Sequence, residues 1–173
     1  MTISPYIREL RARLGSARLL MPSVAALVYD AAGSLLLVRQ SDGDVWSTPG
    51  GTIELGESPA DAVVRETWEE TGLLVEPVRI AAIYGGADFT VRYPNGDETQ
   101  YVISVFECER RGGELRADHD ETVDVAYVSA EEAAGIPLAP WLQHVLGSFY
   151  SRPPAPAFAK ARWKPPTPYR RST

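Results

Sequence analysis

The sequence of 173 residues contains one cysteine, Cys108, and only two histidines. A lone thiol excludes an internal disulfide and is typical of a reducing compartment. The first ten residues lack the apolar core of a secretory signal, and no apolar run approaches the ~18 residues of a membrane-spanning helix. We therefore expect a cytoplasmic protein without a membrane partner.

Charge is distributed unevenly along the chain. Acidic residues outnumber basic ones by 23 to 17, but residues 151–173 contain six basic residues, six prolines and no acid. We therefore expect three parts: an accessory helix in residues 1–19, one domain over 20–150, and a basic tail over 151–173 that forms no core. The tail is expected to lie on its own acidic body or on a second copy in a homodimer, and we do not expect it to bind nucleic acid.

Residues 50–73 have the most distinctive pattern. Ser58 is a suitable N-cap, Pro59 suits the first helical position, and Gly72 can end the helix in the left-handed conformation. The apolar spacing predicts a buried stripe that includes Val63, Thr67 and Trp68. Three glutamates, by contrast, share one other face at positions i, i+3 and i+4: Glu66, Glu69 and Glu70.

Like charges at this helical spacing repel one another unless a cation lies between them. Mg²⁺ prefers oxygen ligands and is often shared between carboxylates and substrate phosphates. The glutamates therefore predict a divalent-metal site, with a solvated acidic helix face as the alternative. Arg65 and Glu57 are positioned to form an ion pair that holds neighbouring carboxylates in place.

The order Gly51, Glu57, Arg65-Glu66, Glu69-Glu70, Gly72, Leu73 resembles the Nudix box, with Thr67 where the family has an aliphatic residue. The resemblance, MutT-like in type, covers residues 20–146 and implies an α/β/α sandwich with a mixed sheet. It also implies a hydrolase acting on the diphosphate linkage of a nucleoside diphosphate derivative, with Mg²⁺ as the cofactor and Mn²⁺ as a substitute. The metal ligands implied are Glu66, Glu69, Glu70 and the carbonyl of Gly51.

Further site residues are assigned by position and by the same resemblance. Glu66 or Glu121 is the expected general base, in a catalytic group with Arg65 and Glu57, and Glu121 could instead be part of a solvated acidic turn. Arg39 is predicted to end a strand near the substrate, and Tyr84 or Phe89 could stack on a nucleobase. The alternatives for these residues are a solvent-exposed edge cation and ordinary core packing.

Strands are predicted near residues 24–29, 35–39, 73–84, 98–108 and 123–128, and helices over 4–14, 59–71 and 130–150. The expected substrate is a nucleoside triphosphate or a nucleotide sugar, such as ADP-ribose. The family signatures for ADP-ribose, dinucleoside polyphosphates, coenzyme A and NADH are, however, all missing from this sequence. One alternative is a nucleotide-binding regulator with little turnover, and another is a structural Ca²⁺ module.

Overall fold

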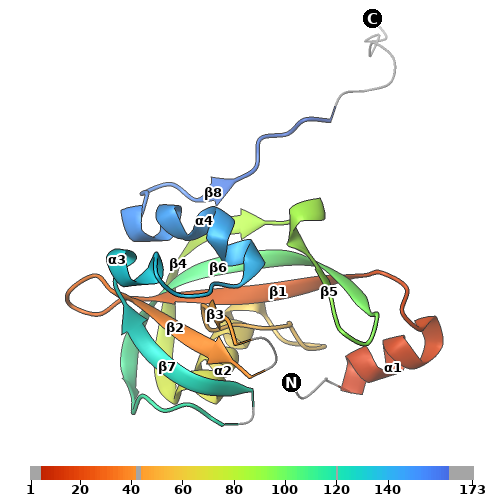
Figure 1. Ribbon diagram of the computed structural model, residues 1–173, viewed down its shortest axis with the longest axis horizontal. Coiled ribbons are helices and arrows are strands. Elements are labelled where there is room, and N and C mark those ends of the chain that lie inside the picture. Colours follow the sequence, from red (N-terminus) through yellow and green to blue (C-terminus); the bar gives the residue numbers. More distant parts are fainter. Residues whose placement is uncertain (1–4, 42–43, 120, 164–173) are drawn as a thin grey trace, which may run out of the picture.

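The computed structural model describes residues 5–41, 44–119 and 121–163 (Figure 1). The larger of its two sheets contains, in spatial order, β1 (Leu19–Val28), β6 (Glu98–Gly113), β4 (Leu73–Tyr84) and β8 (Ala157–Phe158), with β5 (Thr90–Arg92) paired to β6. Strand β1 runs parallel to β6, whereas β4 and β5 run antiparallel to it. The sheet is therefore mixed, as predicted.

The smaller sheet contains β3 (Trp46–Ser47), β2 (Leu35–Gln40) and β7 (Thr122–Val128) in that order. Both of its pairings are antiparallel. A 3₁₀ turn, η1 (Ala87–Phe89), precedes β5. The hairpin predicted at the Asn-Gly dipeptide is present between β5 and β6, and Gly96 adopts a φ of 87° there.

Helices α2 (Pro59–Thr71) and α4 (Pro140–Ser151) cover opposite faces of the larger sheet (Figure 1). Alternate residues of β1 separate the two cores. Val24 and Ala26 pack in the cluster that holds Val63 of α2, whereas Ala25 and Leu27 pack in the cluster that holds Leu142 and Phe149 of α4. Because β1 is covered on both faces, its sequence is apolar without alternation. The predicted α/β/α sandwich is confirmed.

The helix predicted over residues 130–150 is divided in two. Helix α3 (Ala130–Ala133) ends soon after its capping box at Ser129, and α4 begins only at Pro140. Proline lacks the N–H that a helix interior requires, and it disfavours the helical conformation of the preceding residue. Pro137 and Pro140 therefore explain why the helix does not run through this stretch.

The two ends of the chain also have defined segments. Helix α1 (Pro5–Leu14) agrees with the predicted N-terminal helix, although its predicted cap, Ser4, lies outside the described residues. Part of the predicted tail forms β8, which pairs in parallel with Ala82 and Ile83 of β4. Residues 164–173 of that tail also lie outside the description. No helix in the described ranges has both the length and the apolarity needed to cross a membrane.

Candidate metal and substrate site

Helix α2 has the ends that its sequence predicts. The Ser58 hydroxyl oxygen accepts a hydrogen bond of 3.1 Å from the backbone N–H of Asp61, which satisfies one of the helix's unpaired donors. Gly72 adopts a left-handed φ of 69° and donates its N–H to the carbonyl of Trp68 at 2.9 Å. These two caps fix where the helix begins and ends, and so which face of it carries the glutamates.

The buried stripe of α2 differs from the predicted one. Its buried residues are Ala62, Val63, Thr67, Glu70 and Thr71. Trp68, predicted to be in the core, is 45% exposed, whereas Glu70 is only 6% exposed. The prediction placed all three glutamates on a face away from the core. Instead, the stripe is rotated so that Glu70 lies between the helix and the chain at Gly50.

Glu70 is a buried carboxylate held from one side. The backbone N–H of Gly50 donates to its Oε2 at 2.8 Å. Burial raises the pKa of Glu70 well above the usual value, the hydrogen bond from Gly50 opposes this, and the negative charge of Glu66 and Glu121 adds to it. Within the part of the chain that the structure describes, no Lys or Arg pairs with this carboxylate.

Glu66 lies against the backbone of Gly51. A Cβ atom built at Gly51 would lie 2.5 Å from Oε1 of Glu66, so any larger residue there would displace the carboxylate from this position. Burial raises the pKa of Glu66 to about 7, although the neighbouring Arg65 partly opposes the rise. Desolvation is the largest cause of this rise, and the negative charges of Glu69 and Glu121 add to it.

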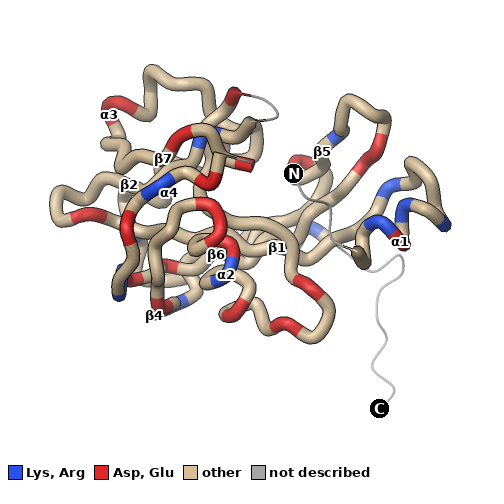
Figure 2. Tube along the Cα trace, turned by 90° about the horizontal axis from the view of Figure 1, so that it is seen from below, with Lys and Arg blue, Asp and Glu red and all other residues tan. Residues whose placement is uncertain are grey.

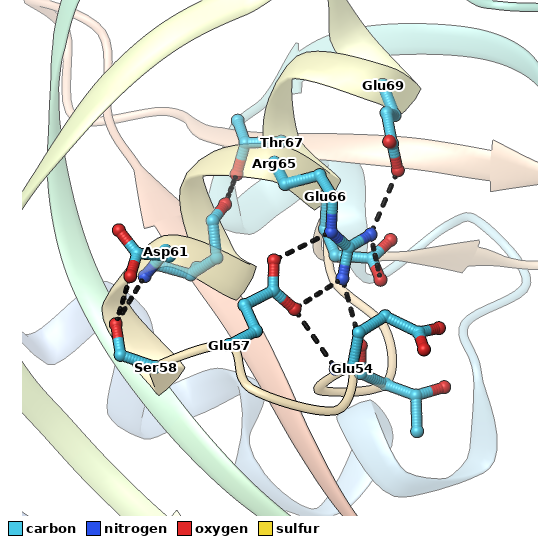
Figure 3. Close-up of polar contacts among 10 residues, drawn as sticks. Glu54, Glu57, Ser58, Asp61, Arg65, Glu66, Thr67 and Glu69 are labelled. Atoms are coloured by element: carbon cyan, nitrogen blue, oxygen red, sulfur yellow. Dashed lines mark hydrogen bonds and ion pairs between the residues drawn. The ribbon is translucent and has the colours of Figure 1, made fainter. Parts of the chain in front are cut away.

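Arg65 joins the box residues into one ionic network (Figure 3). Its Nε and Nη2 donate to the two carboxylate oxygens of Glu57 at 2.8 and 2.9 Å, and Nη2 also donates to the carbonyl of Thr52 at 3.1 Å. Its Nη1 contacts Glu66 at 2.9 Å and Glu69 at 3.0 Å. These five contacts match the five N–H donors of a guanidinium group. The hydrogen bonds from Arg65 lower the pKa of Glu57.

The box opens onto a cavity of about 610 Å³. Its walls include several of the predicted site residues, which come from three parts of the chain: Gly51, Arg65, Glu66, Glu69, Glu70 and Glu121. In Figure 2, acidic segments cluster around α2 and the neighbouring loops. The structure therefore places Glu121 on the same cavity as the three glutamates of α2, although it is about 50 residues away in the sequence. Glu57 lies behind Arg65 and does not line the cavity.

The carbonyl of Gly51 has a different environment from the one predicted. It accepts a hydrogen bond of 2.7 Å from the Ser23 hydroxyl and one of 2.9 Å from the N–H of Val24. A carbonyl oxygen has two lone pairs, so both are used within the protein. The carbonyls of residues 49 and 51 point toward β1, whereas the N–H of Gly50 points toward Glu70. The backbone at Gly50 therefore faces the glutamates, and the carbonyl of Gly51 faces away from them. Sequence reasoning missed this alternation.

Glu121 is positioned by a residue that we had not singled out. Oδ1 of Asp118 accepts hydrogen bonds from the N–H groups of Glu121 and Thr122 and from the Thr122 hydroxyl, at 2.9 to 3.1 Å. The Thr122 hydroxyl in turn donates to the carbonyl of Glu70 at 3.0 Å. The loop that carries Glu121 is thus tied to the end of α2. Aspartate followed by threonine four residues later is the pattern that marks this turn.

Three predicted substrate contacts lie elsewhere. Tyr84 and Phe89 stack on each other with ring centroids 5.5 Å apart, and both pack against the core cluster beneath α4. Arg39 pairs with Asp44 at 3.0 Å and with Asp124 at 3.8 Å. None of the three lines the cavity. The placement of Tyr84 and Phe89 matches the alternative of core packing. Arg39 differs from both expectations, because β2 is the middle strand of the smaller sheet and the guanidinium pairs with two carboxylates there.

The donor set suits a hard divalent cation, since every carboxylate near α2 supplies oxygen and the buried Glu70 lacks a cationic partner among the described residues. In this structure no three acidic, histidine or cysteine side chains of the described ranges converge into a metal-binding group. Nη1 of Arg65 occupies the position between Glu66 and Glu69. A cation binding to these two carboxylates would therefore compete with the guanidinium.

Comparison with known proteins identifies the family to which this fold and site belong. A family model described as the NUDIX domain matches residues 19–149. A MutT-like protein of Streptomyces ambofaciens is 34% identical over 112 residues, which cover 65% of this chain and 66% of the relative. An ADP-ribose pyrophosphatase of Methanocaldococcus jannaschii is 36% identical over 106 residues, which cover 58% and 59%. The chain thus spans less than two thirds of the length of both relatives.

Among solved structures, a crystal structure of an ADP-ribose pyrophosphatase from Streptococcus suis has a TM-score of 0.62 and 28% sequence identity. The superposition covers 79% of this chain and 96% of the other. Residues before 19 and after 149 lie outside the matched family domain. Helix α1 and strand β8 therefore lie outside the residues that the family model matches.

Proposed function

This chain belongs to the Nudix family, and from that premise we propose that it hydrolyses the diphosphate linkage of a nucleoside diphosphate derivative with the help of Mg²⁺ or Mn²⁺. The observation that carries the proposal is the Glu70 carboxylate. It is 6% exposed, lies on the cavity, and has no cationic partner among the described residues. A buried charge of this kind is stable only when it is paired, protonated or bound to a metal.

Glu66, Glu69 and Glu70 would hold the cation, and we propose the carbonyl of Gly50 in place of that of Gly51 as the backbone ligand. A bound divalent cation neutralises phosphate charge and lowers the pKa of a bound water. Arg65 and Glu57 keep the glutamates oriented, as outer-shell partners of metal ligands do. In the reaction a water oxygen bonds to one phosphorus, and the bond from that phosphorus to the bridging oxygen breaks.

We assign the general base to Glu121 rather than to Glu66. Glu66 shares its helix face and its arginine partner with Glu69, which fits a ligand. Glu121 lines the same cavity from a different loop, so it can accept the proton of the attacking water without leaving a ligand position. Asp118 fits the role less well, because its Oδ1 already accepts three hydrogen bonds within the loop.

The test is the release of nucleotide products from a panel of nucleoside triphosphates, nucleotide sugars, dinucleoside polyphosphates and ADP-ribose. Each compound is incubated with Mg²⁺, with Mn²⁺ or with chelator, and the products are separated by anion-exchange chromatography. We expect cation-dependent cleavage of at least one compound. If compounds bind but none is cleaved under any condition, the proposal fails and the nucleotide-binding regulator becomes the better description.

A further inference from the structure

The cavity has a second wall, which contains none of the box residues. It is formed by α1 and by the turn and strand that follow β5, and we call it the distal wall: Arg11, Tyr93, Asn95, Asp97, Thr99 and Tyr101. Figure 1 shows α1 and the β5–β6 hairpin side by side at one end of the larger sheet. Because α1 lies outside the matched family domain, this wall is formed partly by a segment beyond that domain.

Arg11 fixes the two halves of the distal wall to each other. Its Nη2 donates to the carbonyl of Glu98 at 2.9 Å and to the Thr99 hydroxyl at 3.0 Å, and its Nε lies 3.4 Å from Oδ2 of Asp97. Its Nη1 donates to the carbonyl of Ala17 at 2.8 Å. The Arg11 side chain is only 14% exposed. The wall is therefore a built surface with its donors and acceptors held in place.

The polar groups of the distal wall suit a neutral ligand with hydroxyl groups. The hydroxyls of Tyr93 and Tyr101 lie 2.7 Å apart, and Nδ2 of Asn95 donates to Oδ2 of Asp97 at 3.0 Å. Phenol and amide groups both donate and accept, whereas a carboxylate only accepts. A sugar hydroxyl can do both, so it matches such a surface. A phosphate would meet the like charge of Asp97.

The charges around the cavity also favour a neutral ligand. Its walls carry seven carboxylates and two arginines: Glu54, Glu66, Glu69, Glu70, Asp97, Asp118 and Glu121, with Arg11 and Arg65. Arg65 has five contacts with protein groups, and Arg11 is engaged by Asp97, Thr99 and backbone carbonyls. Among the cavity residues that the structure describes, no cation is left for a further phosphate.

This arrangement discriminates between two kinds of substrate. A nucleoside triphosphate ends in a phosphate with a charge of roughly −1.5 to −2 at neutral pH, as other phosphate monoesters have. That group would have to lie among carboxylates outside the reach of the cation at the box. In a nucleotide sugar the second phosphate is esterified, so both phosphates lie in the linkage that is cleaved and the remaining group is neutral.

We propose that the distal wall selects nucleoside diphosphate sugars over nucleoside triphosphates, with Asp97 and Tyr101 as specificity-determining residues that hydrogen-bond the sugar hydroxyls. The proposal rests on the hydrolase function above and names its substrate class. Water adds to one phosphorus of the diphosphate, the bridging P–O bond breaks, and the products are a nucleoside monophosphate and a sugar phosphate. No oxidant or further co-reactant is needed.

The experiment compares kcat and KM of the full chain for ADP-ribose and for ATP, both with Mg²⁺, in the wild type and in Asp97→Asn and Tyr101→Phe. Loss of one hydrogen bond to the substrate should lower kcat/KM for ADP-ribose about tenfold, mainly by raising KM. The value for ATP should not fall, and in Asp97→Asn it should rise because a like charge is removed. Tyr127→Phe, on β7 and outside the cavity lining, is the matched control.

The outcomes separate this proposal from the function on which it rests. The sugar assignment would be overturned if the wild type had a higher kcat/KM for ATP than for ADP-ribose. It would also be overturned if the variants lowered kcat/KM for both substrates equally at an unchanged melting temperature. Either result would leave the hydrolase function intact. Absence of cleavage of every compound would overturn the hydrolase itself. Asp97→Asn could unfold because Arg11 loses its partner. Tyr101→Phe removes only one oxygen atom, so it would still distinguish the two substrates.

Discussion

The backbone N–H of Gly50 donates a hydrogen bond of 2.8 Å to Oε2 of Glu70, a residue 20 positions further along the chain. This contact joins the chain segment before the box to the last turn of α2. Among the described residues no cation pairs with this buried carboxylate, and its charged neighbours Glu66 and Glu121 repel it. A divalent cation would remove this repulsion.

Replacement of Glu70 by glutamine tests that relationship. An amide carries no charge, so we expect the melting temperature of the metal-free protein to rise, while the increase caused by Mg²⁺ in the wild type disappears. Hydrolysis should be lost. Differential scanning calorimetry with Mg²⁺ and with chelator measures both effects, and Glu109→Gln, an exposed position on β6, is the control. An undiminished Mg²⁺ effect in Glu70→Gln would place the cation elsewhere.

Gly51 offers a steric test of the same site. Its Cβ in Gly51→Ala would lie 2.5 Å from Oε1 of Glu66, so the carboxylate must move. Since a displacement of about 1 Å can cost roughly 100-fold in rate, we expect a loss of that order in kcat with the fold retained. Gly112→Ala is the matched control, because its Cβ would meet nothing within 4 Å. Wild-type turnover in Gly51→Ala would show that Glu66 needs no close packing.

Arg65→Lys asks whether charge or geometry matters in the network of Figure 3. Lysine keeps the positive charge but cannot make the paired contacts to Glu57 while reaching Glu66 and Glu69. Loss of outer-shell support typically costs roughly 10- to 100-fold in metal affinity or activity, and we expect a loss in that range. Titration of activity with Mg²⁺ gives the measurement. Arg111→Lys, in an exposed ion pair with Glu76, should leave activity unchanged.

The two candidates for the general base are distinguishable by their effect on cation binding. Glu121→Gln should lower kcat by roughly 10²- to 10⁴-fold, the usual contribution of a general base, without changing the Mg²⁺ affinity. Glu66→Gln should weaken Mg²⁺ binding as well, since we assign it as a ligand. Mg²⁺ affinity is measured by isothermal titration calorimetry. A variant of Glu121 that binds Mg²⁺ less tightly would exchange the two roles.

Glu107, which lies away from the site, should make the stability of the fold depend on pH. Burial alone would raise its pKa, but hydrogen bonds from Arg152 and Arg79 lower it below the usual value. Below the ordinary glutamate pKa of about 4.3, the unfolded chain therefore binds more protons than the folded one, and stability falls as the pH falls. Urea unfolding at several acidic pH values should show a smaller decline in Glu107→Gln than in Glu109→Gln. Equal declines would contradict the assignment.

Much of the fold could be predicted from local patterns. The limits of α2 follow from Ser58, Pro59 and Gly72, which act within one helical turn of their own position. The strands predicted near residues 24–29 and 73–84 are present because runs of β-branched and aliphatic residues suit a buried sheet. The division of the last helix was missed, although Pro137 and Pro140 are visible in the sequence, because the apolar spacing after Pro140 was extended backwards across them.

The candidate site was predictable only as far as its spacing is local. Glu66, Glu69 and Glu70 were placed on one helix, and the structure adds that Glu70 is buried, which depends on the chain at Gly50. The aromatic pair of Tyr84 and Phe89 was misplaced because a glycine-rich loop with aromatic residues can face either a ligand or a core. Here it packs beneath α4.

By itself, the sequence determined the family, the helix that carries the carboxylates and the ion pair between Arg65 and Glu57, since these depend on residue types at short, fixed separations. Only the tertiary structure decided what faces those carboxylates. Arg11, Tyr93, Asp97 and Tyr101 reach the cavity through long-range contacts, such as the one that joins Arg11 to Thr99 over 88 positions. Contacts at that separation depend on how α1 and β6 pack, which no local pattern encodes.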